Sequence, residues 1–355
     1  MILTKVRYRQ LNWILKDLIL GYSNLIVGKN SSGKSRVIFI IDSFAKVILQ
    51  KKNFYWGSSE LSFLNEKEEE IKYRIICKTF DKVYKEVITI NNKLLLYRNE
   101  KICKIFSYKK NDFELINPPS DKLVLHVRRD IDEYPFLENI VNWANKTYGF
   151  KFGNVTPYSF IIDKDLDNLT SVEDIASLLY HLPEESKKLV VEEFNSLGYS
   201  IGKVYSKEKN EKNILYVYDK SVKTKLPQQS MSQGMFRSLA LLIFIEYIIK
   251  RQSIQTLLID DLCEGLDFDR ATKLGKLVYY KCDKNKIQLI ATSNDSFLMN
   301  VIDIEYWNIL VRKDKEVKSF NYSNNNEIFQ AFHFSGLSNF DFFASDFLDR
   351  KNKKI

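Results

Sequence analysis

The segment LIVGKNSSGKS, residues 25–35, constrains the fold more than any other part of this sequence. An apolar strand end leads into G-x-x-x-x-G-K-S, and the run RVIFIIDSFAKVIL that follows has the length and apolar positions of a buried helix. A glycine-rich loop between a strand and a helix presents backbone N–H groups and a helix N-terminus to a phosphate. The sequence therefore predicts an α/β fold that binds a nucleoside triphosphate.

The loop and the residue after it supply the predicted nucleotide-binding site. Its backbone N–H groups form a concave nest for phosphate oxygens, and its two glycines allow the backbone to approach the ligand closely. Lys34 is expected to reach the β- and γ-phosphates, and the Ser35 hydroxyl is expected to bind Mg²⁺. The predicted nucleotide-binding residues of this segment are Gly28, Lys29, Asn30, Ser31, Ser32, Gly33, Lys34, Ser35 and Arg36.

Two adjacent aspartates end a second apolar run, TLLIDDLCEGLD at residues 256–267. In an NTPase with such a loop, an acid at the end of another strand helps the loop hydroxyl to hold Mg²⁺. We assign Asp260 to the metal, directly or through a water. Asp261 would orient the attacking water and accept its proton, which is the work of a general base. The alternative is a strand that merely runs into an acidic turn.

A third segment, QQSMSQGMFRSLALLIFIEY at residues 228–247, places Ser232, Gln233 and Gly234 at the start of an apolar helix. It resembles the signature motif of ABC-type ATPases, in the version found in SMC-like and RecF-like heads. In that family the signature serine and glycine bind the γ-phosphate of ATP held by a second subunit. The resemblance therefore implies that Ser232 and Gly234 act across a dimer, with Gln233 between them. An ordinary N-cap of a buried helix is the alternative.

The resemblance continues beyond the aspartates, with two departures. CEGLDFDR, residues 263–270, occupies the place of the family's D-loop. Where the family usually has a glutamate, this chain has Asp261, whose side chain is one methylene shorter. Where the family often has a histidine after the next strand, this chain has Asn294 or Asp295. Asn294 joins the predicted nucleotide-binding residues, and the departures imply that hydrolysis is slow or needs a partner to complete the site.

The resemblance also implies the architecture: an α/β P-loop NTPase of the ABC-ATPase head type, with an antiparallel β subdomain and a compact helical lobe. Residues 1–128 and 250–320 would form the nucleotide-binding core with its β subdomain. Residues 129–249 would form the helical lobe that ends in the signature helix. Residues 321–355 would form an aromatic-rich C-terminal segment.

Local patterns add detail to this outline. Strand-like runs fill much of the segment before the lobe, among them KLVLHVRR at residues 122–129, and Asn91 and Asn92 predict a hairpin. Within the lobe, Thr170 or Ser171 offers a helix start. No sustained heptad pattern is present, so the lobe is expected to be compact rather than a long coiled coil.

Composition bounds the partners and the compartment. The net charge of +9 is compatible with a polyanionic partner, but the basic residues are spread along the chain and form no dedicated arm. The four cysteines form no CxxC pair, which favours a reducing, cytoplasmic location. No membrane partner is expected, since the longest apolar stretch is too short to span a bilayer. The phenylalanines between Phe329 and Phe347 would pack onto the body or dock a partner.

These observations lead to one main hypothesis and one alternative. The resemblance implies a head-to-tail homodimer that binds and hydrolyses ATP with Mg²⁺ and so drives or gates action on DNA or on a separately encoded effector. Genome maintenance and anti-phage defence are the settings in which such ATPases occur. The alternative is an ATP-gated, dimerising binding module with little or no hydrolysis.

Overall fold

The computed structural model describes residues 1–54, 56–79, 82–158, 175–209, 212–251, 255–333 and 338–344. The chain forms two compact units: unit 1 comprises Met1–Thr147 and Ile304–Phe334, and unit 2 comprises Tyr148–Asp303 and Ser335–Ile355. The expected helix start at Thr170 or Ser171 lies outside the described residues. The predicted division into core, lobe and C-terminal segment stays a prediction.

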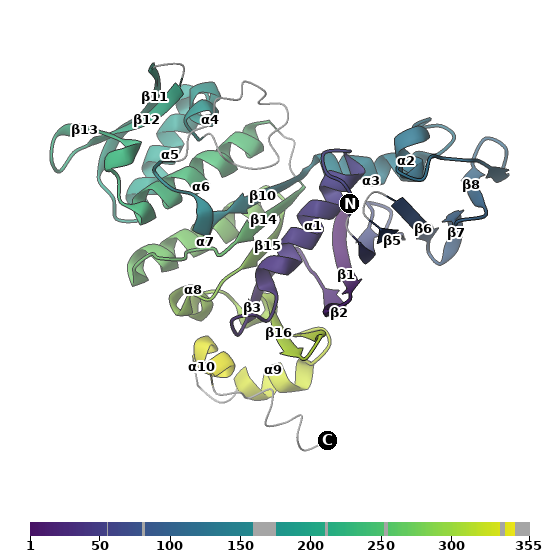
Figure 1. Cartoon of the computed structure of the whole chain (residues 1–355). Coiled ribbons are helices and arrows are strands. Elements are labelled where there is room, and N and C mark those ends of the chain that lie inside the picture. Colours follow the sequence, from purple (N-terminus) through teal and green to yellow (C-terminus); the bar gives the residue numbers. More distant parts are fainter. Residues whose placement is uncertain are drawn as a thin grey trace. The chain divides into compact units, whose positions relative to one another are not determined.

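Unit 1 is built on a mixed sheet. Its strands are β1 (Ile2–Gln10), β2 (Trp13–Ile19), β3 (Ser23–Gly28), β4 (Gly57–Leu64), β5 (Glu70–Thr79), β6 (Lys82–Ile90), β7 (Lys93–Arg98), β8 (Cys103–Ser107), β9 (Asp112–Leu115), β16 (Trp307–Lys313) and β17 (Glu316–Asn321). Its helices are α1 (Lys34–Ile48), α2 (Val124–Val127), α3 (Pro135–Asn145) and α9 (Asn326–His333), with the short 3-10 turn η4 (Ile304–Tyr306). Figure 1 labels many of these elements.

The strands of unit 1 lie in the order β3-β16-β17-β2-β1-β4-β5-β6-β7-β8-β9. β3 runs parallel to β16 and β17 runs parallel to β2, whereas the strands from β2 through β1 to β9 pair antiparallel. The strand that leads into the phosphate loop therefore begins this order, and an antiparallel extension ends it. This extension is the predicted β subdomain.

The predicted hairpin at Asn91 and Asn92 is confirmed. Ile90 pairs with Lys93, so these two asparagines form the whole loop between β6 and β7. Their φ angles of 47° and 63° are both in the left-handed region. A two-residue turn of this kind matches the twist of the strands, and asparagine tolerates the conformation better than most residues.

The strand predicted for KLVLHVRR is wrong, because its centre forms the short helix α2. The backbone N–H of Val124 donates to the carboxylate of Glu86 at 3.1 Å, and the N–H of Leu123 donates to Nδ1 of His126 at 3.1 Å. These side-chain acceptors satisfy the donors at the helix start, which a strand would have paired with a neighbour. The apolar side chains of Val124 and Leu125 are buried in either conformation, so apolar content alone could not separate the two.

Unit 2 contains two sheets. Its strands are β10 (Thr147–Lys151), β11 (Ile201–Lys209), β12 (Lys212–Asp219), β13 (Thr224–Pro227), β14 (Thr256–Asp260) and β15 (Gln288–Thr292). Its helices are α4 (Ile175–His181), α5 (Glu184–Ser196), α6 (Gln233–Lys250), α7 (Phe268–Lys284), α8 (Ser296–Val301) and α10 (Asn339–Ala344), with the 3-10 turns η1 (Phe152–Asn154) and η3 (Gln228–Ser230). β10, β14 and β15 are neighbours, and β14 runs parallel to β15.

The second sheet of unit 2, β11-β12-β13, is antiparallel and lies against α4 and α5 (Figure 1). It falls within residues 129–249, where the sequence predicted a helical lobe. That region does contain helices, but the sheet was not predicted.

Three of the C-terminal phenylalanines are buried. Phe329 and Phe332 of α9 are buried in unit 1, and Phe342 of α10 is buried in unit 2. The prediction that these aromatic side chains pack onto the body is confirmed for these three. Of the helices in the described part of the chain, none is both long and apolar enough to cross a membrane.

The buried carboxyl of Glu86 makes the stability of unit 1 depend on pH. Tyr73 donates its hydroxyl to this carboxyl at 2.7 Å, and an Arg98 nitrogen lies 3.7 Å away. Burial nevertheless dominates and raises the pKa of Glu86 from 4.5 to about 7. Because the folded-state pKa is the higher one, the stabilisation is full below the unfolded value and is lost as the pH rises through the folded value.

We therefore expect the wild type to lose about 2 kcal/mol of unfolding free energy between pH 5 and pH 8, relative to Glu86→Gln. Urea unfolding of both proteins at the two pH values measures this difference. Glu66→Gln, on an exposed turn, is the matched control and should track the wild type. An unchanged difference between wild type and Glu86→Gln would show that Glu86 does not titrate in this range.

Candidate functional site

The predicted site residues fall in both units. The phosphate loop, residues 28–36, belongs to unit 1, whereas the signature residues, the two aspartates and Asn294 belong to unit 2. The predicted strand–loop–helix order is confirmed, because β3 ends at Gly28 and α1 begins at Lys34. Within unit 2, Asp260 and Asp261 share contacts at the end of β14, whereas Gly234, at the start of α6, lies against Leu266.

Two glycines of the loop have no room for a side chain. A Cβ at Gly28 would lie 2.5 Å from the Ser32 hydroxyl oxygen and 2.8 Å from the Leu310 carbonyl oxygen. A Cβ at Gly33 would lie 2.6 Å from the ring of Trp13, and the φ angle of Gly33 is 104°. Only glycine combines that backbone conformation with so close an approach. The backbone of the loop therefore packs directly against the Leu310 carbonyl of β16 and the Trp13 ring of β2.

Cationic side chains hold the shape of the loop. The ammonium of Lys34 is buried and donates to the Gly28 carbonyl at 2.8 Å and to the Lys29 carbonyl at 3.5 Å. On the outer side, Arg312 of β16 donates from Nη1 to the Ser31 carbonyl at 3.2 Å. Ser31 itself has a left-handed φ of 66°. Sequence reasoning missed Arg312, because it lies far along the chain and belongs to no motif.

The start of α1 fits an anionic ligand. Its N-cap, Gly33, offers no side chain to the first N–H groups, and its first turn has no acidic residue. By contrast, α6, α7 and α8 are capped by their own side chains. The buried hydroxyl of Ser32 finds no hydrogen-bond partner among the described residues. A phosphate in the loop would satisfy both the hydroxyl and the uncapped N–H groups, and the exposed Ser35 lies at the same helix end.

Arg36, the last predicted residue of the loop segment, is held by an aromatic wall. Its guanidinium carbon lies 4.8 Å from the ring centroid of Trp13 and 6.0 Å from that of Tyr8. It also donates to the side-chain oxygen of Gln10. This cation–π contact fixes the guanidinium beside the ring that supports Gly33, and a direct contact of Arg36 with nucleotide stays a prediction.

In unit 2, one hydroxyl positions both predicted acidic residues. Thr292 ends β15, next to the end of β14, and donates its hydroxyl to Asp260 at 2.6 Å. The same oxygen accepts the backbone N–H of Asp261 at 2.9 Å. Asp261 has a left-handed φ of 55°, so the chain turns sharply between the two carboxylates. The Thr292 hydroxyl therefore fixes the positions of both Asp260 and Asp261 at the end of β14.

Further bonds across this strand end fix the turn that follows. The N–H of Leu262 donates to the Thr292 carbonyl at 2.8 Å, and the Ser293 hydroxyl donates to the Leu262 carbonyl at 2.8 Å. Asn294 and Asp295 are the two residues that stand where the family often has a histidine. Asp295 caps α8, because its carboxylate accepts the N–H of Leu298 at 2.7 Å. Asn294 is exposed, which favours it over Asp295 as the residue that contacts a ligand.

The signature residues form the start of α6. Ser232 is the N-cap, and its hydroxyl accepts the N–H of Met235 at 3.3 Å. Ser232 and Gln233 are exposed, which suits a role toward a second molecule. A Cβ at Gly234 would lie 2.9 Å from Leu266 of the D-loop segment, so the signature and the D-loop are packed together.

Arg237, one turn into α6, fastens these segments. Its guanidinium is nearly buried and donates to three backbone carbonyls, those of Gly153, Val155 and Glu264. Hydrogen bonds from a charged donor are stronger than neutral ones, so this is a firm connection between signature helix, η1 and D-loop. In the same cluster, a Cβ at Gly153 would lie 3.5 Å from a carboxylate oxygen of Asp261.

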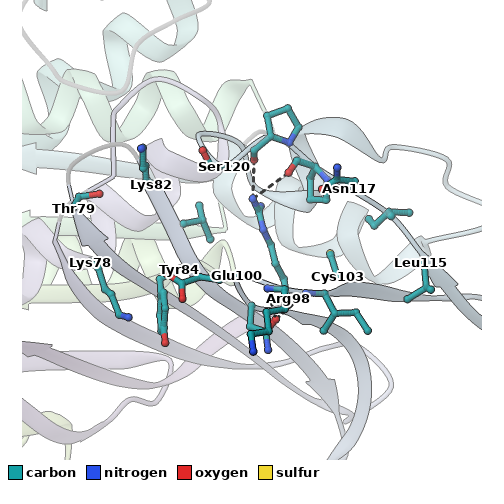
Figure 2. A pocket seen from close by; sticks show the side chains of 17 residues that line it. Lys78, Thr79, Lys82, Tyr84, Arg98, Glu100, Cys103, Leu115, Asn117 and Ser120 are labelled. Carbon is teal, nitrogen blue, oxygen red and sulfur yellow. Dashed lines mark hydrogen bonds between the residues drawn. The ribbon is translucent and has the colours of Figure 1, made fainter.

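A cavity of about 910 Å³ lies among the outer strands of unit 1 (Figure 2). Its wall includes Arg98, which donates to the carbonyls of Pro119 at 2.7 Å and Lys122 at 2.6 Å. The guanidinium therefore holds the segment after β9 in place. Of the described residues that line this cavity, none belongs to the phosphate loop.

Comparison with known proteins identifies the family and the fold of this chain. The family model described as "AAA domain, putative AbiEii toxin, Type IV TA system" matches residues 23–300. A comparison with curated protein sequences found no match.

Among solved structures, an SMC head bound to the C-terminal winged-helix domain of ScpA is similar, with a TM-score of 0.53 and 13% identity over 92% of this chain and 100% of that one. The Pyrococcus furiosus Smc head with an extended coiled coil, bound to the C-terminal domain of ScpA, gives a TM-score of 0.51 and 11% identity over 93% of this chain and 99% of that one. The predicted fold class is confirmed: this is the fold of an SMC-type ATPase head.

The bridging hydroxyl of Thr292 gives a testable prediction. Thr292→Val keeps the shape of the side chain but leaves Asp260 and the N–H of Asp261 without their shared partner. For the Mg²⁺-dependent ATPase activity that the sequence predicts, we expect a fall of about 10- to 100-fold, because ligand-orienting groups next to a metal site carry effects of this size. Thr292→Ser retains the hydroxyl and is the matched control. Steady-state hydrolysis at several Mg²⁺ concentrations measures both, and wild-type activity in Thr292→Val would contradict the positioning role.

Proposed function

We propose, from the premise that this chain belongs to the AAA-domain family that matches residues 23–300, that it binds and hydrolyses ATP with Mg²⁺. The observation that carries the proposal is the start of α1, where uncapped N–H groups, a glycine cradle and the buried Ser32 hydroxyl converge. Such an end of a helix favours a phosphate. The fold of an SMC-type head supports the same reading.

In the proposed reaction, the loop N–H groups and Lys34 hold the β- and γ-phosphates. Ser35 and Asp260 would hold Mg²⁺, which offsets phosphate charge when bound; one or two protein ligands suffice because phosphates and waters complete its shell. Asp261 orients a water for attack on the γ-phosphorus and accepts its proton. The bond to the bridging oxygen breaks, and ADP and phosphate are released.

The site is completed by a second copy of the chain. Ser232 and Gly234 of one protomer would contact the γ-phosphate held by its partner, and Asn294 would approach the same phosphate within its own protomer. The exposure of Ser232 supports this trans role. Closing and opening of the dimer would then gate action on DNA or on a separately encoded effector, in genome maintenance or anti-phage defence, in a cytoplasmic setting.

A second candidate function is an ATP-gated module that turns over little. It is favoured by the short side chain of Asp261, which packs against Gly153, and by Asn294 in the place of a histidine. In that case Asp260 and Asp261 serve to bind Mg²⁺ in a switch, and dimerisation rather than hydrolysis is the output.

The proposed dimer and the proposed role of Asp261 each predict a property of the ATPase activity. We expect the specific ATPase activity of the wild type to rise with protein concentration, because each site needs two protomers. Asp261→Asn cannot accept the proton, and its rate should fall about 10²- to 10⁴-fold while ATP affinity is kept. Steady-state hydrolysis and calorimetric titration measure the two quantities.

Lys34→Ala is the control that loses ATP binding itself, since the ammonium that shapes the loop is gone. If wild type and Asp261→Asn bind ATP equally and neither hydrolyses it, with or without DNA, the switch hypothesis replaces the ATPase hypothesis. If Lys34→Ala binds ATP as tightly as the wild type, the phosphate loop is not the site.

If Ser232 contacts the nucleotide of the partner protomer, a change at Ser232 should abolish dimerisation and leave ATP binding by the monomer intact. Ser232→Arg puts a bulky side chain at the exposed start of α6, so ATP-dependent dimerisation should disappear while the monomer still binds ATP. Sedimentation of Asp261→Asn and of Asp261→Asn/Ser232→Arg with ATP measures this, with Ser221→Arg on an exposed turn of unit 2 as the matched control. A dimer that persists in the double variant would rule out the trans contact.

A further inference from the structure

The three-stranded sheet of unit 2 has two different faces. Toward the helices, Val204, Leu215 and Val217 are buried where β11 and β12 pack on α4 and α5. On the same side Asn213 donates to the hydroxyl of Ser177 in α4 at 2.7 Å. Because side chains alternate along a strand, the residues between these positions point the other way. Those on the outward face include Lys203, Tyr205, Lys207, Tyr216, Tyr218 and Lys225.

The strand register gathers the aromatic rings into one row. Tyr205 pairs with Tyr216, and their rings are nearly parallel, at 10°, with centroids 5.5 Å apart. Tyr218, two residues further on β12, pairs with Lys203 on one side and with Lys225 on the other. Tyr218 is 37% exposed, and Tyr205 and Tyr216 are partly exposed. The outward face therefore carries a row of three tyrosines with lysines on both sides.

The charges on the two faces are segregated. Lys203, Lys207 and Lys225 are all exposed. Glu208 pairs with Asn213 and so lies on the face of the helices. The carboxylate of Asp219 accepts the N–H groups of residues 221 and 222 at 2.7 and 3.1 Å, which commits it to the turn after β12. Among the described residues of this sheet, those charged on the outward face are thus lysines.

We propose that this outward face of β11-β12-β13 binds single-stranded nucleic acid. Aromatic rings on a sheet surface stack on unpaired bases, and lysines beside them contact the phosphates between those bases. Both features are present here in alternation, at positions fixed by the strand register. An acidic peptide or an anionic membrane would be attracted by the lysines alone, and a base-paired duplex keeps its bases stacked inside. The tyrosine row therefore points to a single strand.

This site goes beyond the proposed ATPase function, because none of its residues belongs to the phosphate loop, the signature or the aspartate pair. It is tested without ATP, so its failure and the failure of the ATPase hypothesis are separate results. Lys34→Ala should bind a single strand as the wild type does when no nucleotide is present.

The test is fluorescence anisotropy of the full chain with labelled oligo-dT and oligo-rU of equal length. Tyr216→Ala/Tyr218→Ala should weaken binding at least about tenfold, because each stacked base is worth roughly one factor of ten. Tyr216→Phe/Tyr218→Phe keeps the rings and should bind nearly as the wild type. Lys203→Ala/Lys225→Ala should lower the slope of log affinity against log salt by about 1.4, or about 0.7 for each lost phosphate contact.

The matched control is Tyr280→Ala/Lys284→Ala, which removes a tyrosine–lysine pair from α7, where the ring centroid and ammonium are 5.8 Å apart. It should change the affinity less than twofold. Binding of oligo-dT, oligo-rU or both that depends on the tyrosines supports the proposal. Absence of binding, equal loss in the control, or equal competition by poly-glutamate or by a blunt duplex overturns it. Circular dichroism of each variant confirms that the sheet is folded.

Discussion

The lack of space around the phosphate loop is the constraint on which the rest of unit 1 depends. The positions of Gly28 and Gly33 are closed by a backbone carbonyl at Leu310 and by the ring of Trp13. These contacts come from β16, which pairs with β3, and from β2, which is separated from β16 by β17, so the loop has its shape only when these strands are assembled in this order. The geometry of the phosphate loop therefore depends on the strand order. Arg312 of β16 adds to this dependence, because it donates a hydrogen bond to the Ser31 carbonyl of the loop.

In unit 2, polar contacts rather than close packing fix the positions of the predicted site residues. The Thr292 hydroxyl bridges Asp260 and Asp261, and Arg237 joins three backbone segments. Hydrogen bonds that involve a charged group contribute about 1.5–3 kcal/mol each, enough to hold a strained turn such as that at Asp261. In the proposed ATPase, these bonds would keep the two acids in fixed positions.

The features that depend on residues close together in the sequence could be predicted. The contacts between residues far apart in the sequence could not. The loop, the strand before Asp260, the helix capped by Ser232 and the fold class were predicted, because each has a local motif. The contacts of Thr292 and Arg237 depend on which strands and turns become adjacent, which no local pattern states. The same limit explains the error at α2, where the deciding acceptor for Val124 is Glu86, far away in sequence. The sheet β11-β12-β13 was missed although β11 and β12 are nine and eight residues long, because the lysines and other polar residues of β11 leave few apolar positions to reveal a strand.

The signature helix and the outward sheet face belong to one packed body within unit 2. Lys281 of α7 is buried and contacts Glu193 of α5 at 2.5 Å and Glu246 of α6 at 3.2 Å. Removing one partner of a buried ion pair costs about 3–5 kcal/mol, so α5, α6 and α7 resist moving apart. α5 and α4 also pack on both α6 and the inner face of β11. A displacement of the start of α6, where Ser232 lies, must therefore carry the tyrosine row with it. If the proposed dimer closes at Ser232 as inferred above, the proposed nucleic-acid face would be displaced together with the start of α6, without any contact between nucleotide and nucleic acid.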